Sequence, residues 1–427
     1  MREMKDSGIE WLGNIPKNWS LKKGKFVFKQ RNTKGNNRNL ELLSPTQRYG
    51  VISQTEYEKL TGMKAVKLKE KTDLSQLKTI HSGDYCISLR SFQGGFEFCL
   101  NEGVVSPAYQ VFYAQVPTIP DYYKYLFKDD AFISKMNSFT MSLRDGKNIA
   151  FSDFGNTLIP YPPLSAQQAI ADFLDAKCAD IDSLVADIQK QIEILKEYKK
   201  SVITQAVTKG LDPNVEMKDT VSPYWNQIPM NWYLSDIKYV FEIVKRIAGK
   251  EGYDILSVTQ KGLKIKDISH NEGQIAENYK GYQFVYPGDF VMNHMDLLTG
   301  WVDLSKLFGV TSPDYRVFKL RDNHVNEARY YKYVMQCCYS CRIFYSLGQG
   351  VSTLGRWRLQ TSAFNNFLIP VPPITEQKAI TDFLDAKCAD IDAAIAGKQK
   401  QLDVLKEYKK SLIYEYVTGK KEVPCRE

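Results

Sequence analysis

The chain has 427 residues and a formal net charge of +8, and 43% of its residues are hydrophobic and 12% aromatic. This composition excludes a disordered chain and favours two or three folded domains. It contains no run of about 18 apolar residues, which argues against a membrane-spanning helix. Residues 1–13 lack the apolar core of a signal peptide, so we expect a cytoplasmic protein.

Eight cysteines fit a reducing compartment. Cys337, Cys338 and Cys341 form a local cluster, but a zinc site needs four ligands at suitable spacing, and the chain has only four histidines and no second CxxC. We therefore expect no metal site in this chain.

Residues 1–160 form the first predicted globular domain, and the positive charge is concentrated in them. They hold 23 basic and 16 acidic side chains, whereas residues 161–210 hold 6 and 7. An excess of positive charge favours a polyanionic partner such as DNA. A weakly basic protein without such a partner would have the same total charge.

Three segments of this first domain are candidates for DNA contact. They are a basic run after Trp19, a loop after Gly83-Asp84-Tyr85 and a glycine-containing loop before residue 150. Arginine suits guanine and glutamine suits adenine in the major groove. The candidates are Lys22, Lys23, Lys25, Arg31, Arg90, Gln93, Arg144, Lys147 and Asn148. A solvated basic face and ordinary loops are the alternatives.

Residues 161–210 form the first predicted spacer helix. Tyr161-Pro162-Pro163 interrupts the preceding segment, and Ser165 with Gln168 three residues later predicts a capping box. A seven-residue apolar repeat then continues through the segment, which is typical of a coiled coil.

Residues 211–370 form the second predicted globular domain, a diverged copy of the first. Alternating runs at 109–113 and 315–319 predict equivalent strands, and each unit is expected to have an α+β fold. The loops that correspond to those of the first domain differ in sequence, as expected of two domains that bind different targets. They supply the candidates Asn293, His294, Thr299, Gln349, Ser352, Arg356 and Arg358.

Residues 371–427 form the second predicted spacer helix and a tail. Residues 159–203 and 369–413 align without a gap, and 30 of the 45 positions are identical. The simplest way to bury both apolar stripes is to pair the helices, and two similar halves related by a two-fold axis require an antiparallel pair. The predicted fold class is therefore α+β, with two similar domains separated by two long antiparallel helices in a pseudo-two-fold arrangement.

Acidic residues on the outer face of both helices are candidates for binding a partner protein used twice. Three aspartates of the first helix recur in the second: Asp175, Asp180 and Asp182 recur as Asp385, Asp390 and Asp392. A solvated face or a recent duplication would explain the same copying.

The layout resembles the DNA-specificity subunit of Type I restriction-modification systems over essentially the whole chain. The motifs that carry the resemblance are the opening Lys5-Asp6-Ser7-Gly8-Ile9-Glu10-Trp11-Leu12-Gly13, the segments Ile-Pro-x-Pro-Pro…Gln…Ala-Ile…Phe-Leu-Asp from Ile159 and Ile369, and Val105-Ser106-Pro107-Ala108-Tyr109 with its partner.

The resemblance implies two target recognition domains that each read one half of a bipartite site in double-stranded DNA, held apart by the coiled coil. It also implies two modification subunits, which use S-adenosylmethionine, and two restriction subunits, which use ATP and Mg2+. This chain would then have no catalytic residue and bind no cofactor. The alternatives are a self-contained methyltransferase or nuclease, whose motifs we do not find, and a coiled-coil scaffold that binds no DNA.

Overall fold

The computed structural model describes residues 2–35, 40–47, 49–63, 74–87, 95–139, 149–267, 278–350 and 357–424. The chain divides into two compact units, Met1–Ile188 with Lys400–Glu427, and Gln189–Gln399. We call them the first unit and the second unit. Each contains one globular domain, the N-terminal part of one long helix and the C-terminal part of the other.

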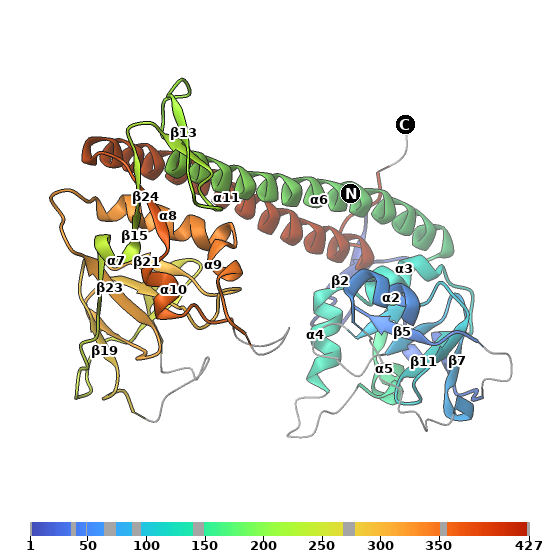
Figure 1. The fold of residues 1–427 in the computed structure, drawn as a ribbon. Helices are drawn as coiled ribbons and strands as arrows, with labels where there is room; N and C mark the ends of the chain where they lie inside the picture. The colour runs from blue at the N-terminus through green and yellow to red at the C-terminus, as the bar shows by residue number, and fades with distance from the viewer. Residues whose placement is uncertain are drawn as a thin grey trace. The chain divides into compact units, whose positions relative to one another are not determined.

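The globular part of the first unit is built on a four-stranded antiparallel sheet (Figure 1). Phe28 lies at its centre, with ring centroids 5.5 Å from Tyr85, 5.5 Å from Phe112 and 5.1 Å from Tyr123. The sheet order is β4(Phe28–Arg31), β11(Gln110–Ala114), β8(Tyr85–Ile87) and β9(Phe96–Phe98). Strand pairs around it are β1(Met4–Asp6) with β2(Asn14–Pro16), β3(Ser20–Lys23) with β12(Leu158–Tyr161), β5(Leu43–Thr46) with β6(Gly50–Ser53), and β7(Lys78–Ile80) with β10(Gly103–Val105). The helices are α1(Gly24–Val27), α2(Gln54–Thr61), α3(Pro120–Leu126), α4(Asp130–Ser138) and α5(Phe151–Asn156).

The second unit repeats this topology. Its central residue is Phe241, whose ring lies 5.2 Å from Phe290, 5.1 Å from Phe318 and 5.4 Å from Tyr331. The sheet order is β16(Phe241–Val244), β23(Arg316–Leu320), β20(Phe290–Met292) and β21(Val302–Leu304). The other strand pairs are β13(Met217–Asp219) with β14(Gln227–Pro229), β15(Tyr233–Asp236) with β24(Leu368–Val371), β17(Leu256–Thr259) with β18(Gly262–Ile265), and β19(Gln283–Val285) with β22(Gly309–Thr311). The helices are α7(Ile237–Val240), α8(Ala328–Ser340), α9(Ile343–Ser346) and α10(Thr361–Asn365). The predicted pair of similar α+β domains is confirmed.

The two long helices are α6(Leu164–Lys209) and α11(Ile374–Val417). In the first unit the ring of Phe173 lies 4.5 Å from that of Tyr416, and Lys409 donates to Asp182 at 2.6 Å. Because residue numbers rise along α6 while those of its contacts on α11 fall, the helices pack antiparallel, as predicted.

The second unit has the corresponding contacts. Lys199 donates to Asp392 at 2.7 Å, and Lys398 donates to Gln191 nearby. Asp182 and Asp392 are copies of one position, as are Lys199 and Lys409. The same interhelical ion pair is therefore made once in each unit.

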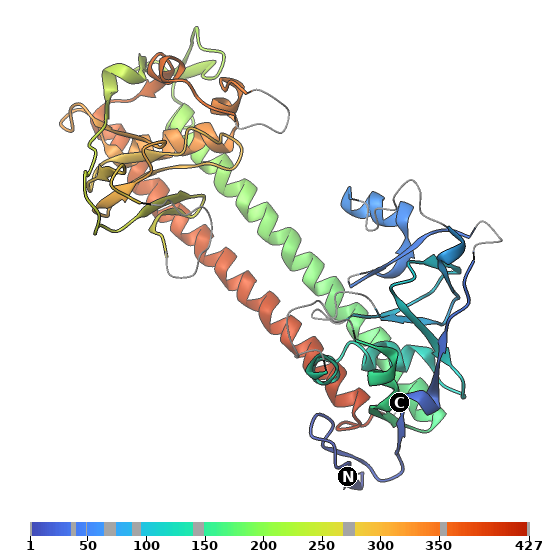
Figure 2. The ribbon, with the colours of Figure 1, turned by 90° about the horizontal axis from the view of Figure 1, so that it is seen from below.

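A tryptophan of each globular domain packs on the glycine that ends a long helix. In the first unit a Cβ on Gly419 would lie 2.6 Å from Pro16 and 2.9 Å from Trp19, and in the second unit a Cβ on Gly210 would lie 3.4 Å from Trp232. Both glycines have a positive φ, 73° and 76°, which ends the helix without strain. Figure 2 shows the start of the chain beside the end of α11.

Buried Glu97 predicts a pH dependence of stability in the first unit. Its side chain is 2% exposed and lies 2.7 Å from the ammonium of Lys128. Burial raises the pKa of Glu97 from 4.5 to about 7, and the nearby Lys128 offsets this only in part. The carboxyl proton of Glu97 is lost at a lower pH from the unfolded chain than from the folded chain. The contribution of Glu97 to the free energy of unfolding is therefore fully present below pH 4.5 and is lost as the pH rises through about 7.

We expect Glu97→Gln to remove this dependence. At 1.36 kcal/mol per pKa unit, the stability of the variant relative to wild type should increase by about 2–3 kcal/mol between pH 4.5 and pH 8. Urea unfolding at several pH values measures the difference, with the exposed Glu58→Gln as the control. Parallel curves for wild type and Glu97→Gln would contradict the assignment.

Candidate nucleic-acid interface

The predicted basic run of the first domain lies along one edge strand and the short helix after it. Lys22 and Lys23 are on β3, where the Lys22 ammonium lies 3.6 Å from the ring centroid of Tyr161. Lys25 is the second residue of α1 and donates to Asn156 at 3.0 Å. Lys23 and Lys25 are exposed, so their charges are available to a polyanion.

Arg31 is placed differently from its neighbours in the run. Its guanidinium makes a bidentate ion pair with Asp84, with distances of 2.7 and 3.0 Å, and the Asp84 side chain is 4% exposed. The second unit has a comparable pair, Arg246 with Asp289, at 2.6 and 3.2 Å. A buried carboxylate needs an ionic partner, and Arg31 supplies it. The Arg31 guanidinium therefore binds within the domain.

The candidates of the second domain come together beyond the end of β20. The main chain of Leu359 donates to the carbonyl of His294 at 2.9 Å, and Gln349 and Arg358 pair through their main chains. Asn293 accepts from the hydroxyl of Tyr339 at 2.8 Å through its carbonyl. Two segments more than 50 residues apart therefore meet here. We call this group the 293–358 cluster; it contains the candidates Asn293, His294, Gln349 and Arg358.

Arg316 belongs to this cluster and was not predicted. It lies on β23, is 4% exposed, and donates to Leu359 and Thr361 at 3.2 Å. Its Nη1 atom and Nδ1 of His294 have no hydrogen-bond partner among the described residues. The signal in the sequence was an arginine inside an apolar strand, at a position where the first domain has Gln110.

Burial, assisted by neighbouring positive charge, keeps His294 neutral. Burial, and then the cations Arg316 and Arg358, lower the pKa of His294 to about 3. Burial also lowers the pKa of Arg316, to about 10. Arg358 is exposed, so its positive charge is available to an anion, whereas the neighbouring Arg316 and His294 are buried.

Of the remaining candidates, one makes a local hydrogen bond and the others lie outside the described residues. Thr299 is exposed and donates its hydroxyl to Asp296. Arg90, Gln93, Arg144, Lys147, Asn148, Ser352 and Arg356 lie outside the described residues.

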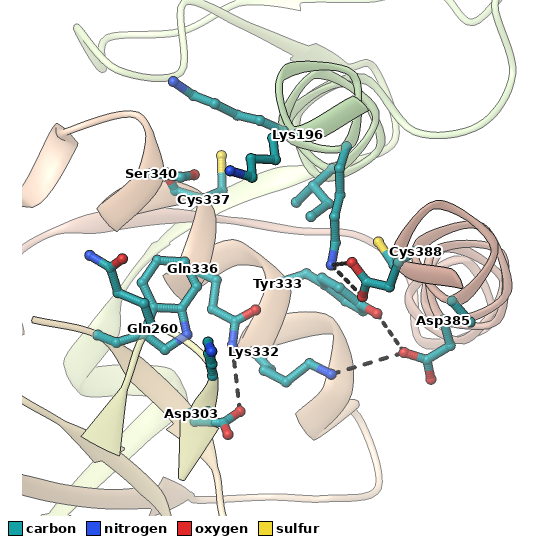
Figure 3. A pocket seen from close by; sticks show the side chains of 18 residues that line it. Lys196, Gln260, Asp303, Lys332, Tyr333, Gln336, Cys337, Ser340, Asp385 and Cys388 are labelled. Carbon is teal, nitrogen blue, oxygen red and sulfur yellow. Dashed lines mark hydrogen bonds and ion pairs between the residues drawn. The ribbon is translucent and has the colours of Figure 1, made fainter. Parts of the chain in front are cut away.

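Two of the candidate partner-binding acids hold a domain helix on a long helix. In the first unit Asp175 accepts from Lys124 at 3.0 Å and from the hydroxyl of Tyr125 at 2.7 Å. In the second unit Asp385 accepts from Arg329 at 2.9 Å. It also accepts from the hydroxyl of Tyr333 at 2.6 Å, a bond drawn in Figure 3. These aspartates therefore have an intramolecular role in each unit.

The tyrosine of this anchor is expected to stabilise its unit measurably. Because the bond is to a carboxylate at a partly buried site, Tyr333→Phe should lower the free energy of unfolding by about 1–2 kcal/mol. Thermal unfolding measures this, and the exposed Tyr239→Phe is the control. Equal melting temperatures for the two variants would show that the bond contributes nothing.

Of the other four acids, two bind a lysine of the opposite long helix and, among the described residues, two do not. Asp182 and Asp392 make the interhelical ion pairs described above. Asp180 is exposed and lies 3.8 Å from Lys177 of its own helix, and Asp390 is exposed. Of the six candidates, Asp180 and Asp390 therefore remain the most accessible to a partner.

A buried glutamine near the start of each long helix was missed. Gln167 is 0% exposed, accepts from the main chain of Ile119 at 2.9 Å and donates to the carbonyl of Pro162 at 2.8 Å. Gln377 does the same with Glu327 and Pro372, at 2.8 Å each. The expected capping box is wrong, because α6 begins at Leu164 and the Gln168 amide binds Asp172.

A pocket of about 730 Å³ lies in the second unit between α8, α6 and α11 (Figure 3). Lys196, Lys199 and Lys332 line it together with Asp385 and Asp392. Since Lys199 and Lys332 face those carboxylates, the pocket is a junction of paired charges between the domain and the long helices.

Within the described ranges, no three His, Cys, Asp or Glu side chains gather in a way that could hold a metal ion. None of the helices in the same part of the chain is long and apolar enough to span a bilayer.

Comparison with known proteins gives a consistent result. The family model described as Type I restriction modification DNA specificity domain matches residues 16–194 and 230–404. The Type I restriction enzyme MjaVIII specificity subunit of Methanocaldococcus jannaschii is 27% identical over 301 residues, covering 66% of this chain and 67% of the relative. The putative MjaX specificity subunit of the same organism is 23% identical over 444 residues, covering 96% and 95%.

Two solved structures share the fold. A chain from a study of complex assembly and conformational transition of the type I R-M system has a TM-score of 0.68 at 14% identity, covering 94% of this chain and 98% of that one. The HsdS subunit from Thermoanaerobacter tengcongensis has a TM-score of 0.50 at 14% identity, covering 97% and 100%.

Proposed function

Since the chain belongs to the family of Type I restriction-modification DNA specificity domains, which it matches twice, we propose that each of its domains reads one half of a bipartite DNA site. The chain is a specificity subunit with two recognition domains. The observation that carries the proposal is the repeat itself: two domains of one topology have different candidate loops, while the helices between them are copied closely. A shared fold with different loops suits two different half-sites.

The kinds of side chain indicate which residues would contact phosphates and which would contact bases. Exposed lysines such as Lys23 and Lys25 suit phosphate contacts, which fix the position on DNA without reading sequence. The 293–358 cluster, with Asn293, Gln349 and Arg358, suits base edges in the major groove. The long helices keep the two half-sites at a fixed spacing.

The chain works with partner subunits that carry the chemistry. We assign it two modification subunits, which transfer a methyl group from S-adenosylmethionine to DNA, and two restriction subunits, which use ATP and Mg2+. The chain itself is non-catalytic and binds none of these cofactors. The complex acts in the cytoplasm on double-stranded DNA, and Asp180 and Asp390 are equivalent exposed positions from which one kind of partner could be bound twice.

A methyl-transfer assay tests this assignment. Purified chain, its modification subunit and the mixture are each incubated with plasmid DNA and labelled S-adenosylmethionine. We expect label in DNA only with the mixture. Label transferred by the chain alone would establish the enzyme alternative, and failure of the mixture to bind or methylate DNA would favour a scaffold.

A further inference from the structure

Two thiols face each other where α8 of the second unit ends against α6. The Sγ atoms of Cys337 and Cys341 lie 3.8 Å apart. Their spacing of four residues at the end of a helix places the Cα atoms about 6 Å apart, inside the range of a disulfide, and the Cβ atoms about 5–6 Å apart, outside it. Closing the bond therefore requires the backbone to move at Cys341, which caps the C-terminal end of α8. The hydroxyl of Thr204 on α6 lies 3.6 Å from Cys337 Sγ and 3.5 Å from Cys341 Sγ.

The surroundings favour a thiolate at one of the two positions. The hydrogen bond from Cys337 lowers the pKa of Cys341, and Thr204 and the positive charge of Lys200 act in the same direction. The same hydrogen bond, with burial, raises the pKa of Cys337. The pair is therefore asymmetric, with Cys341 as the anionic member.

The first unit offers a comparison. Lys410, the copy of Lys200, pairs there with the carboxylate of Asp130 at 3.2 Å. In the second unit Lys200 lines the surface groove that also contains Cys341.

Accessibility separates the three neighbouring cysteines. Cys341 is partly exposed and lines a surface groove with Lys200, Ser201 and Thr204. Cys337 is 1% and Cys338 0% exposed. A small reagent can therefore reach Cys341 first, and Cys337 is the thiol placed to react next.

We propose that Cys337 and Cys341 are an oxidant-reactive dithiol that closes to a disulfide with peroxides. The Cys341 thiolate attacks one peroxide oxygen, which forms a sulfenic acid and releases hydroxide. The Cys337 sulfur then attacks the sulfenic sulfur, forming the S–S bond and releasing water with the thiol proton. Two thiols are oxidised and one hydrogen peroxide is reduced to two waters. The modification is confined to the second recognition domain.

The test treats the folded full-length chain with hydrogen peroxide, blocks remaining thiols with an alkylating reagent and identifies modified cysteines by mass spectrometry. We expect loss of two thiols, a 337–341 crosslink in the peptide that spans both residues, and reversal by dithiothreitol. Cys338→Ser should behave as wild type, and Cys341→Ser should keep its other thiols.

A second variant isolates the first step. In Cys337→Ser, Cys341 should accumulate as a sulfenic acid that dimedone traps at least about tenfold faster than it traps any buried cysteine. Retention of all thiols by the folded wild type, a crosslink through Cys338, or trapping no faster than at the buried cysteines would each overturn the proposal.

Discussion

Replacing Arg358 by alanine is expected to weaken binding of the assembled complex to its DNA site by about 10- to 100-fold, which corresponds to about 1–3 kcal/mol. Arg358 is exposed, and its main chain pairs with Gln349 at the edge of the 293–358 cluster. Its charge helps keep His294 neutral, so the side chain lies close to the other candidate groups.

The salt dependence tells which kind of contact is lost. If Arg358 binds a base, the variant should tolerate a changed base at one position of the second half-site, with the salt slope little changed. If it binds a phosphate, binding should weaken equally on all sequences, and the slope should fall by about one. Fluorescence anisotropy over a series of salt concentrations measures both.

Lys306→Ala is the matched control, because it removes one exposed positive charge at the other end of the β20–β21 pair. It should leave the affinity within about twofold of wild type, as expected for a charge remote from the contact. Equal losses for the two variants would assign the effect to net charge and contradict a specific role for Arg358.

Gln167→Leu and Gln377→Leu are expected to have the largest effects on stability. Each change leaves a main-chain N–H and a proline carbonyl without their buried partner, at about 1–3 kcal/mol for each group. The total is about 2–6 kcal/mol, and the start of α3 or α8 should loosen from its long helix. Urea unfolding measures the loss, and hydrogen exchange at Ile119 or Glu327 locates it.

The neighbouring positions are the controls. Gln168 and Lys378 are exposed one residue further along each helix, so Gln168→Leu and Lys378→Leu should change stability by less than about 0.5 kcal/mol. If the substitutions at 167 and 168 were equally destabilising, the buried bonds would not explain the effect.

The sequence predicted the repeated architecture because both copies are present to compare. Alternating residues at 109–113 and 315–319 became β11 and β23, and the apolar repeats of α6 and α11 pack antiparallel within each unit. These features depend on local periodicity and on burial of an apolar stripe, and both can be detected in the amino-acid sequence alone.

The individual polar contacts were harder to predict, because their partners are distant in the chain. Arg31 was grouped with neighbouring lysines, yet its partner Asp84 lies 53 residues away. Gln167 is indistinguishable from Gln168 by composition, and only the position of Ile119 decides which one is buried. Local sequence therefore indicated where basic and amide groups occur, but not which of them form hydrogen bonds or ion pairs within the domain.

The faithful copying of acidic residues has a structural explanation that the sequence did not supply. Asp175 and Asp385 each accept from a tyrosine hydroxyl of their own unit, and Asp182 and Asp392 each bind a lysine of the opposite helix. Each aspartate is therefore retained in both copies with the same intramolecular contact. Asp180 and Asp390 lack this explanation among the described contacts and remain the stronger candidates for a partner.

The measurement that tests the central claim most directly is methylome sequencing of cells that express this chain with its modification subunit. We predict a bipartite motif with methyladenine in both halves. Exchanging residues 1–160 for those of a related subunit should change one half of the motif and leave the other half and the spacing intact. A motif that changes in both halves, or that ignores the exchange, would contradict the assignment of one half-site to each domain.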